Sequence, residues 1–323
     1  MKKKTFLTLK NPMVHIMRAG EYRIPKHGLL AIFCLAMVVS LLLREILKPL
    51  IRLCWRALAG TGAVPAPGSG IADDLIFSLL LTVSEIICVL IYVRAIENRP
   101  VRTAGMTARG CGAHYLIGLV AGFAVFSGAV GISWALGGLT YTGRDSNIPW
   151  GAMAALLLCW MIQGFSEEIS FRGWLMTSLL RHSSPVSAVV QSALMFAVFH
   201  LGNPGVSVLA FFNLMLFGVF AAFWLLRTGS LWGPAAMHAI WNLLQGNFYG
   251  IKVSGLDVVL TVFRFDAPEG RALLNGGAFG MEGGIGVTAV LLIGIAILYF
   301  TAPSEENAEF GMQNLEGEIR NAE

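Results

Sequence analysis

Long apolar runs separated by short polar segments dominate the hydropathy pattern of this chain. A window of about 19 residues, the length of a bilayer-crossing helix, identifies these runs. They lie near residues 28–48, 74–94, 114–138, 149–180, 185–201, 206–226, 230–248 and 285–301. Because about 20 apolar residues cross a bilayer as an α-helix, the pattern predicts an all-α fold, a polytopic transmembrane helix bundle of about eight spans.

The composition also indicates that lipid is the solvent. Of the 323 residues, 56% are hydrophobic and 13% are charged, and the charged share is about half that of an average soluble domain. A soluble protein of this balance would expose apolar surface that it could not cover. The five scattered cysteines form no CxxC pair and are expected to act as small hydrophobic side chains. The expected surroundings are a lipid bilayer, and no nucleic-acid partner is expected.

The runs divide the chain into regions. The basic N-terminus lacks the features of a cleaved signal peptide, so the first span is expected to be retained. Residues 44–56 either continue that span or lie along the membrane interface, and residues 59–70 are expected to be a loop. The expected regions are a basic cytoplasmic segment at 1–27, N-terminal transmembrane helices at 28–148, a core at 149–248, an extramembrane loop at 249–284, a last helix at 285–301 and an acidic tail at 302–323.

Positive charges gather in alternate connections. They precede the first span and follow the second, fourth and sixth, at Lys2, Lys3, Lys4, Lys10, Arg18, Arg23, Lys26, Arg94, Arg99, Arg102, Arg109, Arg181 and Arg227. With eight spans these positions share one side, which the positive-inside rule makes cytoplasmic. Arg52, Arg56, Lys252, Arg264 and Arg271 go against the pattern. We expect an integral protein of the plasma (inner) membrane with both termini cytoplasmic; the oligomeric state stays open.

Ionisable side chains inside the spans are few and clustered. At the centre of a span each costs about 2.5–3.5 kcal/mol on the insertion scale, so each needs a partner or a function. The cluster occupies the fourth, fifth and seventh spans and comprises Glu167, Glu168, Arg172, His200, His238 and Asn242. Helical spacing places Glu168 and Arg172 on one face as an i,i+4 pair. It turns Glu167 about 100° away, so that this carboxylate can face a cavity.

The same residues are expected at one depth. Glu167 precedes Arg181 by 14 residues, and His200 follows Pro185 by 15 residues. At about 1.5 Å per residue, both side chains lie roughly 20 Å from the turn that joins the two helices. His238 and Asn242 lie about 14–20 Å from the turn before their own span. The spacing therefore predicts one shared pocket.

Peptide hydrolysis is the chemistry that such a pocket favours. A carboxylate in apolar surroundings serves as a general base for water, and a histidine opposite it shares that water. A second histidine, with an asparagine one turn on, supplies donors to an oxyanion. Glu167, His200 and His238 could equally ligate zinc, and spacing does not separate the two. Single polar residues favour structural roles: Glu85, Gln191, Gln245 and Asn247 in helix packing, with Asn213 a weaker candidate for the cavity border.

Three motifs give these residues a family resemblance. The chain reads EExxxR at 167–172, FxxxH at 196–200 and HxxxN at 238–242. In this order, on separate apolar segments, they resemble the CPBP family of intramembrane peptidases, also called the Abi or CAAX-protease family. The match covers roughly residues 149–248. HExxH, the signature of another metalloprotease class, is absent from the sequence.

The resemblance implies a membrane endopeptidase in which Glu167 activates water beside His200. His238 and Asn242 would stabilise the oxyanion, and the ion pair of the first motif would shape the site. The family was named as metalloproteases, yet its eukaryotic prenyl-protein members resemble glutamate-dependent enzymes. We therefore favour a reaction without a cofactor, with zinc as the alternative. The implied substrate is a membrane-associated or lipidated, CaaX-like polypeptide.

Two other functions stay open from sequence. A non-catalytic immunity or scaffold protein could keep the motifs for structure alone. A proton-coupled transporter could use Glu85 and Glu167 as relays, but no pair of short, broken helices in matching halves favours it.

Overall fold

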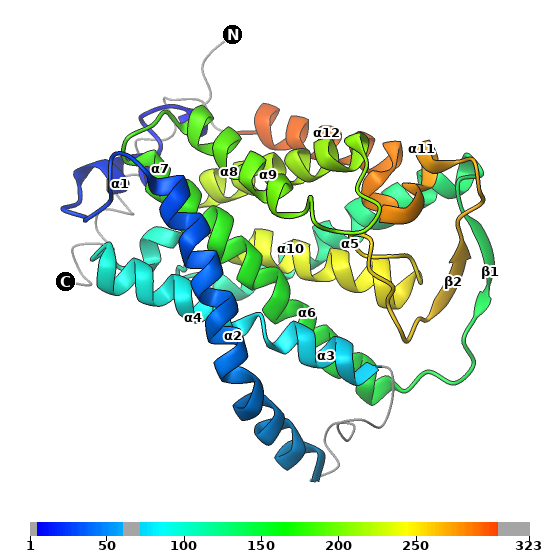
Figure 1. Ribbon diagram of the computed structural model, residues 1–323. Helices are drawn as coiled ribbons and strands as arrows, with labels where there is room; N and C mark the ends of the chain where they lie inside the picture. Colours follow the sequence, from blue (N-terminus) through cyan, green and yellow to red (C-terminus); the bar gives the residue numbers. More distant parts are fainter. Residues whose placement is uncertain (1–4, 61–71, 303–323) are drawn as a thin grey trace.

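The computed structural model describes residues 5–60 and 72–302 of the chain. Most of this part is helical (Figure 1), which confirms the all-α expectation. The α-helices are α1 (Pro12–Ala19), α2 (Leu29–Gly60), α3 (Ala72–Leu80), α4 (Val83–Ile91), α5 (Cys111–Ala135), α6 (Trp150–Glu168), α7 (Thr177–Leu180), α8 (Pro185–Phe199), α9 (Val208–Thr228), α10 (Trp232–Leu243), α11 (Ala272–Asn275) and α12 (Ile285–Phe300). Wider π-helical turns are η2 (Tyr92–Ile96), η4 (Ile169–Met176) and η5 (Leu244–Phe248), and tighter 3-10 turns are η1 (Thr5–Leu7), η3 (Val101–Ala104), η6 (Gly277–Phe279) and η7 (Met281–Gly283).

Helix lengths agree with a polytopic membrane bundle. In the described chain, five helical segments are long and apolar enough to cross a bilayer: Leu29–Ala57, Asp74–Ile96, Cys111–Ala135, Trp150–Leu180 and Val208–Thr228. Helices α8 and α12 are apolar but shorter. The run predicted at 230–248 is helical as α10 and η5, although it belongs to neither group.

Residues 44–56, for which the sequence left two possibilities, are helical. Helix α2 continues through residues 44–56 without a break, with Pro49 inside it, so this stretch extends the span. Residues 61–70 of the predicted loop and the acidic tail after residue 302 lie outside the described residues.

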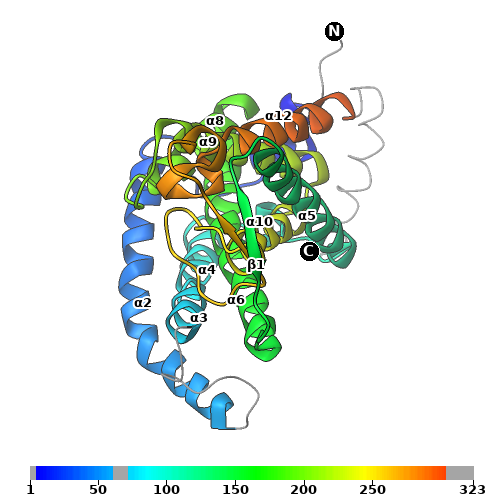
Figure 2. The same cartoon turned by 90° about the vertical axis from the view of Figure 1, so that its right-hand side faces the viewer.

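A small sheet adds to the predicted all-helical fold. Strand β1 (Thr140–Arg144) pairs in antiparallel fashion with β2 (Phe263–Asp266), so the connection after α5 lies beside the segment 249–284 (Figure 2). The hydropathy pattern misses these strands because they are short. The predicted loop at 249–284 therefore contains β2, α11 and two 3-10 turns.

Close helix crossings set the geometry of the centre. Helix α10 lies against α5 and α6, and α8 lies against α9. A Cβ atom at Gly164 of α6 would come 2.8 Å from the backbone nitrogen of Ala239 in α10. Small residues let transmembrane helices approach in this way. The crossing brings the acidic end of α6 next to the middle of α10.

The two ends of the described chain lie together. The ring of Phe6 packs edge-on against that of Tyr299, with centroids 6.2 Å apart. Arg18 donates to the carbonyl of Ser183 in the turn between α7 and α8 at 2.9 Å. Arg227 donates to Thr301 Oγ1 at 2.6 Å. These arginines thus gather at one end of the bundle, together with the start and finish of the described chain.

Candidate active site

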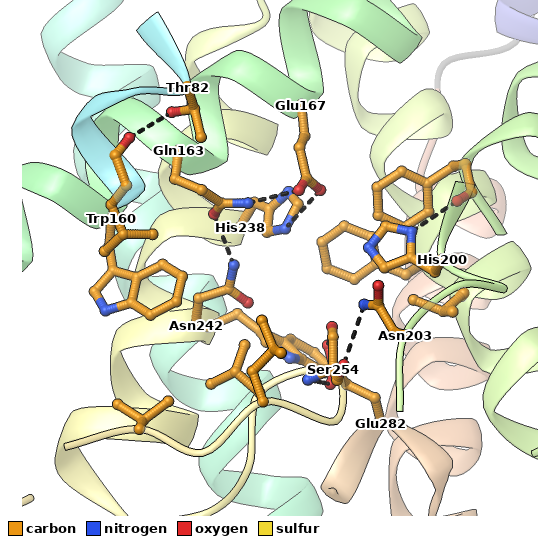
Figure 3. Close-up of a pocket in the computed structure, with 18 of the residues that line it drawn as sticks. Thr82, Trp160, Gln163, Glu167, His200, Asn203, His238, Asn242, Ser254 and Glu282 are labelled. Atoms are coloured by element: carbon orange, nitrogen blue, oxygen red, sulfur yellow. Dashed lines mark hydrogen bonds and ion pairs between the residues drawn. The ribbon is translucent and has the colours of Figure 1, made fainter. Parts of the chain in front are cut away.

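A cavity of about 280 Å³ lies between α6, α8, α9 and α10. Glu167, His200, His238 and Asn242 all line it, and they come from three separate helical segments. Figure 3 shows Glu167 and His238 on one side of the cavity and His200 on the other. The predicted convergence of these four side chains on one pocket is therefore present.

The two adjacent glutamates face different partners. They end the α-helical part of α6, and the wider turns of η4 follow immediately. π-helical turns occur often at functional sites because the added residue redirects side chains. Glu168 is fully buried and accepts a hydrogen bond from Arg172 Nη1 at 3.0 Å, the pair that the i,i+4 spacing predicts. The side chain of Glu167 is 22% exposed and reaches the cavity.

His238 bridges the two carboxylates. Its Nδ1 lies 2.9 Å from Glu168 Oε1, and its Nε2 lies 3.6 Å from Glu167 Oε2. With the carboxylate oxygen of Glu168 as the acceptor of this hydrogen bond, Nδ1 carries the proton. The ring is thereby oriented with Nε2 toward Glu167 and the cavity.

Gln163 is a site residue that sequence reasoning missed. One turn before Glu167, its Nε2 donates to Glu167 Oε1 at 2.6 Å. Its Oε1 accepts a hydrogen bond from Asn242 Nδ2 at 2.9 Å. The amide thus links the carboxylate of α6 to the asparagine of α10. Its i,i+4 spacing from Glu167 was the available signal, since a glutamine inside a span also needs partners.

The second oxygen of Glu167 faces the cavity without a hydrogen bond. Oε2 is buried and, within the described chain, no side chain or backbone group donates to it. The 3.6 Å separation from His238 Nε2 is longer than a hydrogen bond. A hydrogen bond therefore fixes Oε1 of Glu167, while Oε2 can accept a hydrogen bond from a molecule in the cavity.

His200 presents one ring nitrogen to the cavity. It caps the C-terminal end of α8, and its Nδ1 lies 2.8 Å from the carbonyl oxygen of Phe196. Since a carbonyl only accepts, Nδ1 carries the proton and Nε2 is left as an acceptor. The guanidinium carbon of Arg172 also lies over the Phe196 ring, 4.3 Å from the ring centroid. Phe196 therefore contacts both His200 of the FxxxH motif and Arg172 of the EExxxR motif.

The segment 249–284 closes the cavity. Glu282 lines the cavity and accepts hydrogen bonds from the backbone N–H of Ser254 at 2.6 Å, from the Ser254 hydroxyl at 2.9 Å and from Gln245 Nε2 at 2.9 Å. Burial raises the pKa of Glu282, and these hydrogen bonds and the nearby His200 counteract the rise. Asn203 donates to the Ser254 carbonyl at 3.1 Å. The acid therefore fixes this segment against the bundle.

Polar residues assigned to helix packing also hold this segment. Gln245 donates to the carbonyl of Lys252 as well as to Glu282, and Asn247 donates to the carbonyls of Val259 and Leu260. Asn213, the weaker candidate, lines the cavity and donates to the carbonyl of Glu282 at 2.7 Å. These side chains thus join helices to the segment, and two of them also join helix to helix: Asn247 Oδ1 accepts from Trp160 Nε1 of α6 at 2.7 Å, and Asn213 Oδ1 accepts from Thr288 Oγ1 of α12 at 2.7 Å.

The arrangement of Glu167, His200 and His238 does not match a zinc site. In the part of the chain that the structure describes, no three His, Cys, Asp or Glu side chains converge as a group that could hold a metal ion. Glu167 and His238 approach each other, while His200 faces them across the cavity. The residues present thus do not fit a three-ligand zinc site.

The first spans contribute to the cavity wall. Arg44 of α2 lines it, as do four residues of α3 and the turn that follows: Leu75, Ser78, Leu79 and Thr82. Their hydropathy pattern carries no sign of this, because a cavity-facing leucine and a lipid-facing leucine look alike in sequence.

Comparison with known proteins gives one match. Residues 149–244 match the family model described as "Rce1-like: Type II CAAX prenyl endopeptidase Rce1-like". No curated protein matches the chain, and no solved structure matches it. The matched segment contains all three motifs described above.

Proposed function

We propose that the chain, whose residues 149–244 match the Rce1-like family model, is an intramembrane endopeptidase of the CAAX-protease family that hydrolyses a membrane-associated or lipidated polypeptide. The main support for the proposal is the hydrogen bonding of the two carboxylate oxygens of Glu167. Gln163 holds one oxygen at 2.6 Å, and the other faces the cavity beside His238. This is the arrangement that a general base for water requires.

In the proposed reaction, a water molecule lies between Glu167 Oε2 and His200 Nε2. Its oxygen attacks the carbonyl carbon of the substrate while one of its protons passes to Glu167. The carbonyl π electrons move to the oxygen, which becomes an oxyanion. The second N–H of Asn242 Nδ2 donates a hydrogen bond to it, and His238 donates another from Nε2 when the imidazole takes up a second proton from solvent before substrate binds.

Collapse of the intermediate completes the reaction. The carbon–nitrogen bond breaks as the C=O bond re-forms, and Glu167 returns its proton to the leaving amine. Glu168 and Arg172 make no contact with the reacting atoms in this scheme. They orient the ring of His238 through its Nδ1.

Membrane orientation forms part of the proposal. We place the protein in the plasma (inner) membrane with both termini cytoplasmic, because Arg18, Arg181 and Arg227 gather where the described ends meet. Labelling of single cysteines introduced at exposed sites of this end, in intact and in permeabilised cells, tests the orientation. Labelling in intact cells would contradict it.

The function is tested with purified protein in detergent micelles and a fluorogenic peptide that carries a farnesylated cysteine near its C-terminus. We expect cleavage by the wild type and a loss of about 10²- to 10⁴-fold in Glu167→Gln, the usual contribution of a general base. Glu45→Gln is the matched control, because Glu45 is exposed and pairs with Lys48. Equal turnover by Glu167→Gln would remove Glu167 as the base and favour a non-catalytic role.

A further inference from the structure

Part of the cavity wall in the segment 249–284 has backbone groups that the fold leaves unpaired. Asp257 and Val258 line the catalytic cavity. Within residues 5–60 and 72–302, no group hydrogen-bonds the backbone N–H or the backbone carbonyl of either residue. Backbone groups inside a protein are nearly always paired, so free ones in the wall of a cavity are available to a ligand.

The backbone of this part of the wall is extended. The chain passes through residues 257–259 with negative φ and without a turn or bend. Before it, Ser254 and Gly255 form the tight turn of a hairpin, with φ of 48° and 85°. Val253 and Leu256 pair across this turn. Residues 257–259 therefore continue one side of a hairpin and, in the described chain, have no partner strand beyond Leu256.

Glu282, a buried acid that the proposed reaction does not use, fixes the turn. Its carboxylate accepts hydrogen bonds from the N–H and the hydroxyl of Ser254 at 2.6 and 2.9 Å. Gly255 donates from its N–H to the carbonyl of Phe279 at 2.8 Å. Figure 3 shows Glu282 and Ser254 at the edge of the cavity opposite Glu167. The turn is thus held across the cavity from the proposed base.

The π-helical turn η5 holds the other end of the extended stretch. Val258 packs on Gly246, where a Cβ would lie 2.8 Å from Val258 Cγ1. Asn247 donates to the carbonyl of Val259 at 2.8 Å. In extended backbone the groups of successive residues point to opposite edges. Because the Val259 carbonyl points toward Asn247, the N–H and carbonyl of Val258 point to the other edge.

We propose that the substrate binds as an extended strand beside Val258, so that one substrate residue exchanges two backbone hydrogen bonds with it. The N–H of the substrate residue donates to the Val258 carbonyl, and its carbonyl accepts from the Val258 N–H. This inference rests on the proposed function and adds how the polypeptide is held.

This mode of binding restricts the conformation of the substrate. Main-chain hydrogen bonds to a strand edge give affinity without reading side chains. A helix in the membrane pairs its N–H and carbonyl groups internally, so a helical segment would have to unwind before it could bind beside Val258. The substrate that fits is an extended part of a polypeptide.

An ester scan of the substrate tests the inference. In a set of farnesylated fluorogenic peptides, each amide except the scissile one is replaced in turn by an ester, which removes one N–H. We expect kcat/KM of the wild type in micelles to fall about 3- to 10-fold at one position, mainly through KM, as for the loss of one hydrogen bond. Esters at the two neighbouring positions should be cleaved like the all-amide peptide, because their N–H groups would point away from Val258.

Proline variants test the enzyme side. Val258→Pro removes the N–H that would bond to the substrate, and KM for the all-amide peptide should rise about 3- to 10-fold at a nearly constant kcat. Val259→Pro is the matched control, because the Val259 carbonyl is bonded to Asn247 and its N–H shares that edge. Val258→Ala keeps the N–H and should raise KM less than Val258→Pro does.

The possible outcomes separate this inference from the proposed function. Equal cleavage of every ester peptide and the all-amide peptide, equal losses at consecutive positions, or an equal rise of KM in Val259→Pro and Val258→Pro would each overturn the inference. If Val258→Pro fails to fold, the ester scan with the wild type decides alone. Cleavage of no peptide by the wild type, the all-amide peptide included, would contradict the proposed function itself.

Discussion

Glu168 Oε1 lies 2.9 Å from Nδ1 of His238, and the two side chains are almost completely buried. The same oxygen accepts a hydrogen bond from Arg172. One carboxylate thus neutralises an arginine and orients an imidazole, which explains why the motif contains two adjacent acids. Because Glu168 pairs with Arg172, Glu167 does not have to neutralise this cation and can face the cavity.

Removal of the Glu168 charge should destabilise the protein. Glu168→Gln leaves the guanidinium of Arg172 buried without a counter-ion, and breaking one side of a buried pair costs about 3–5 kcal/mol. The free energy of unfolding, measured by titration with a denaturing detergent, should fall by that order. The double variant Glu168→Gln/Arg172→Met removes both charges and should recover most of the loss. A single variant as stable as the wild type would show that Arg172 does not depend on Glu168.

Gln163 should position the base rather than take part in the chemistry. Gln163→Ala frees Oε1 of Glu167 from its 2.6 Å hydrogen bond. Misplacement of a catalytic group by about 1 Å costs on the order of 10²-fold in rate. We expect kcat to fall by up to that factor while KM changes little. Gln191→Ala is the control, because Gln191 bonds to Ser187 outside the cavity. A rise in KM at constant kcat would instead assign Gln163 to substrate binding.

Chelation separates the glutamate reaction from a zinc-dependent one. If Glu167 activates water directly, cleavage of the farnesylated peptide should persist after exhaustive treatment with a chelator. Added zinc should give no increase. The metal content of the active protein, measured in parallel, checks that chelation was complete. Activity that disappears on chelation and returns with zinc would favour coordination by Glu167, His200 and His238.

Local spacing in the sequence predicted much of the geometry of the candidate site. The i,i+4 relation of Glu168 and Arg172 is a property of one helix, and the short turn from Arg181 to Ser184 fixes the depth of His200 relative to Glu167. Hydropathy likewise located the long spans, because burial in lipid demands continuous apolar runs.

Contacts between distant segments could not be predicted from the sequence. Glu282 meets Gln245 across 37 residues and Ser254 across 28, and no periodicity encodes such a meeting. The π-helical turns of η4 have no marker in the hydropathy pattern either. Arg44 interrupts an apolar run, so the sequence leaves open whether residues 44–56 continue the span or lie along the membrane interface. Its position in the cavity wall depends on the path of α2 across the bundle.

The close crossing of α6 and α10 gives a last prediction, about Gly164. A Cβ there would lie 2.8 Å from the Ala239 backbone nitrogen and 3.2 Å from the Ala235 carbonyl oxygen. Neither backbone group can rotate away, so Gly164→Ala should push the helices apart. Overpacking of this kind costs about 1–3 kcal/mol. It should also widen the gap between Glu167 and His238 and lower kcat.

Gly151 supplies the matched control on the same helix. A Cβ at Gly151 would meet no atom within 4 Å. Since alanine favours a helix over glycine by up to about 1 kcal/mol, Gly151→Ala should be as stable as the wild type or slightly more so, at full activity. Both positions lie in α6, so alanine favours the helix at each, and only Gly164→Ala adds a clash with α10. If Gly164→Ala matched Gly151→Ala in stability and turnover, α6 and α10 would not have to touch for the catalytic groups to meet.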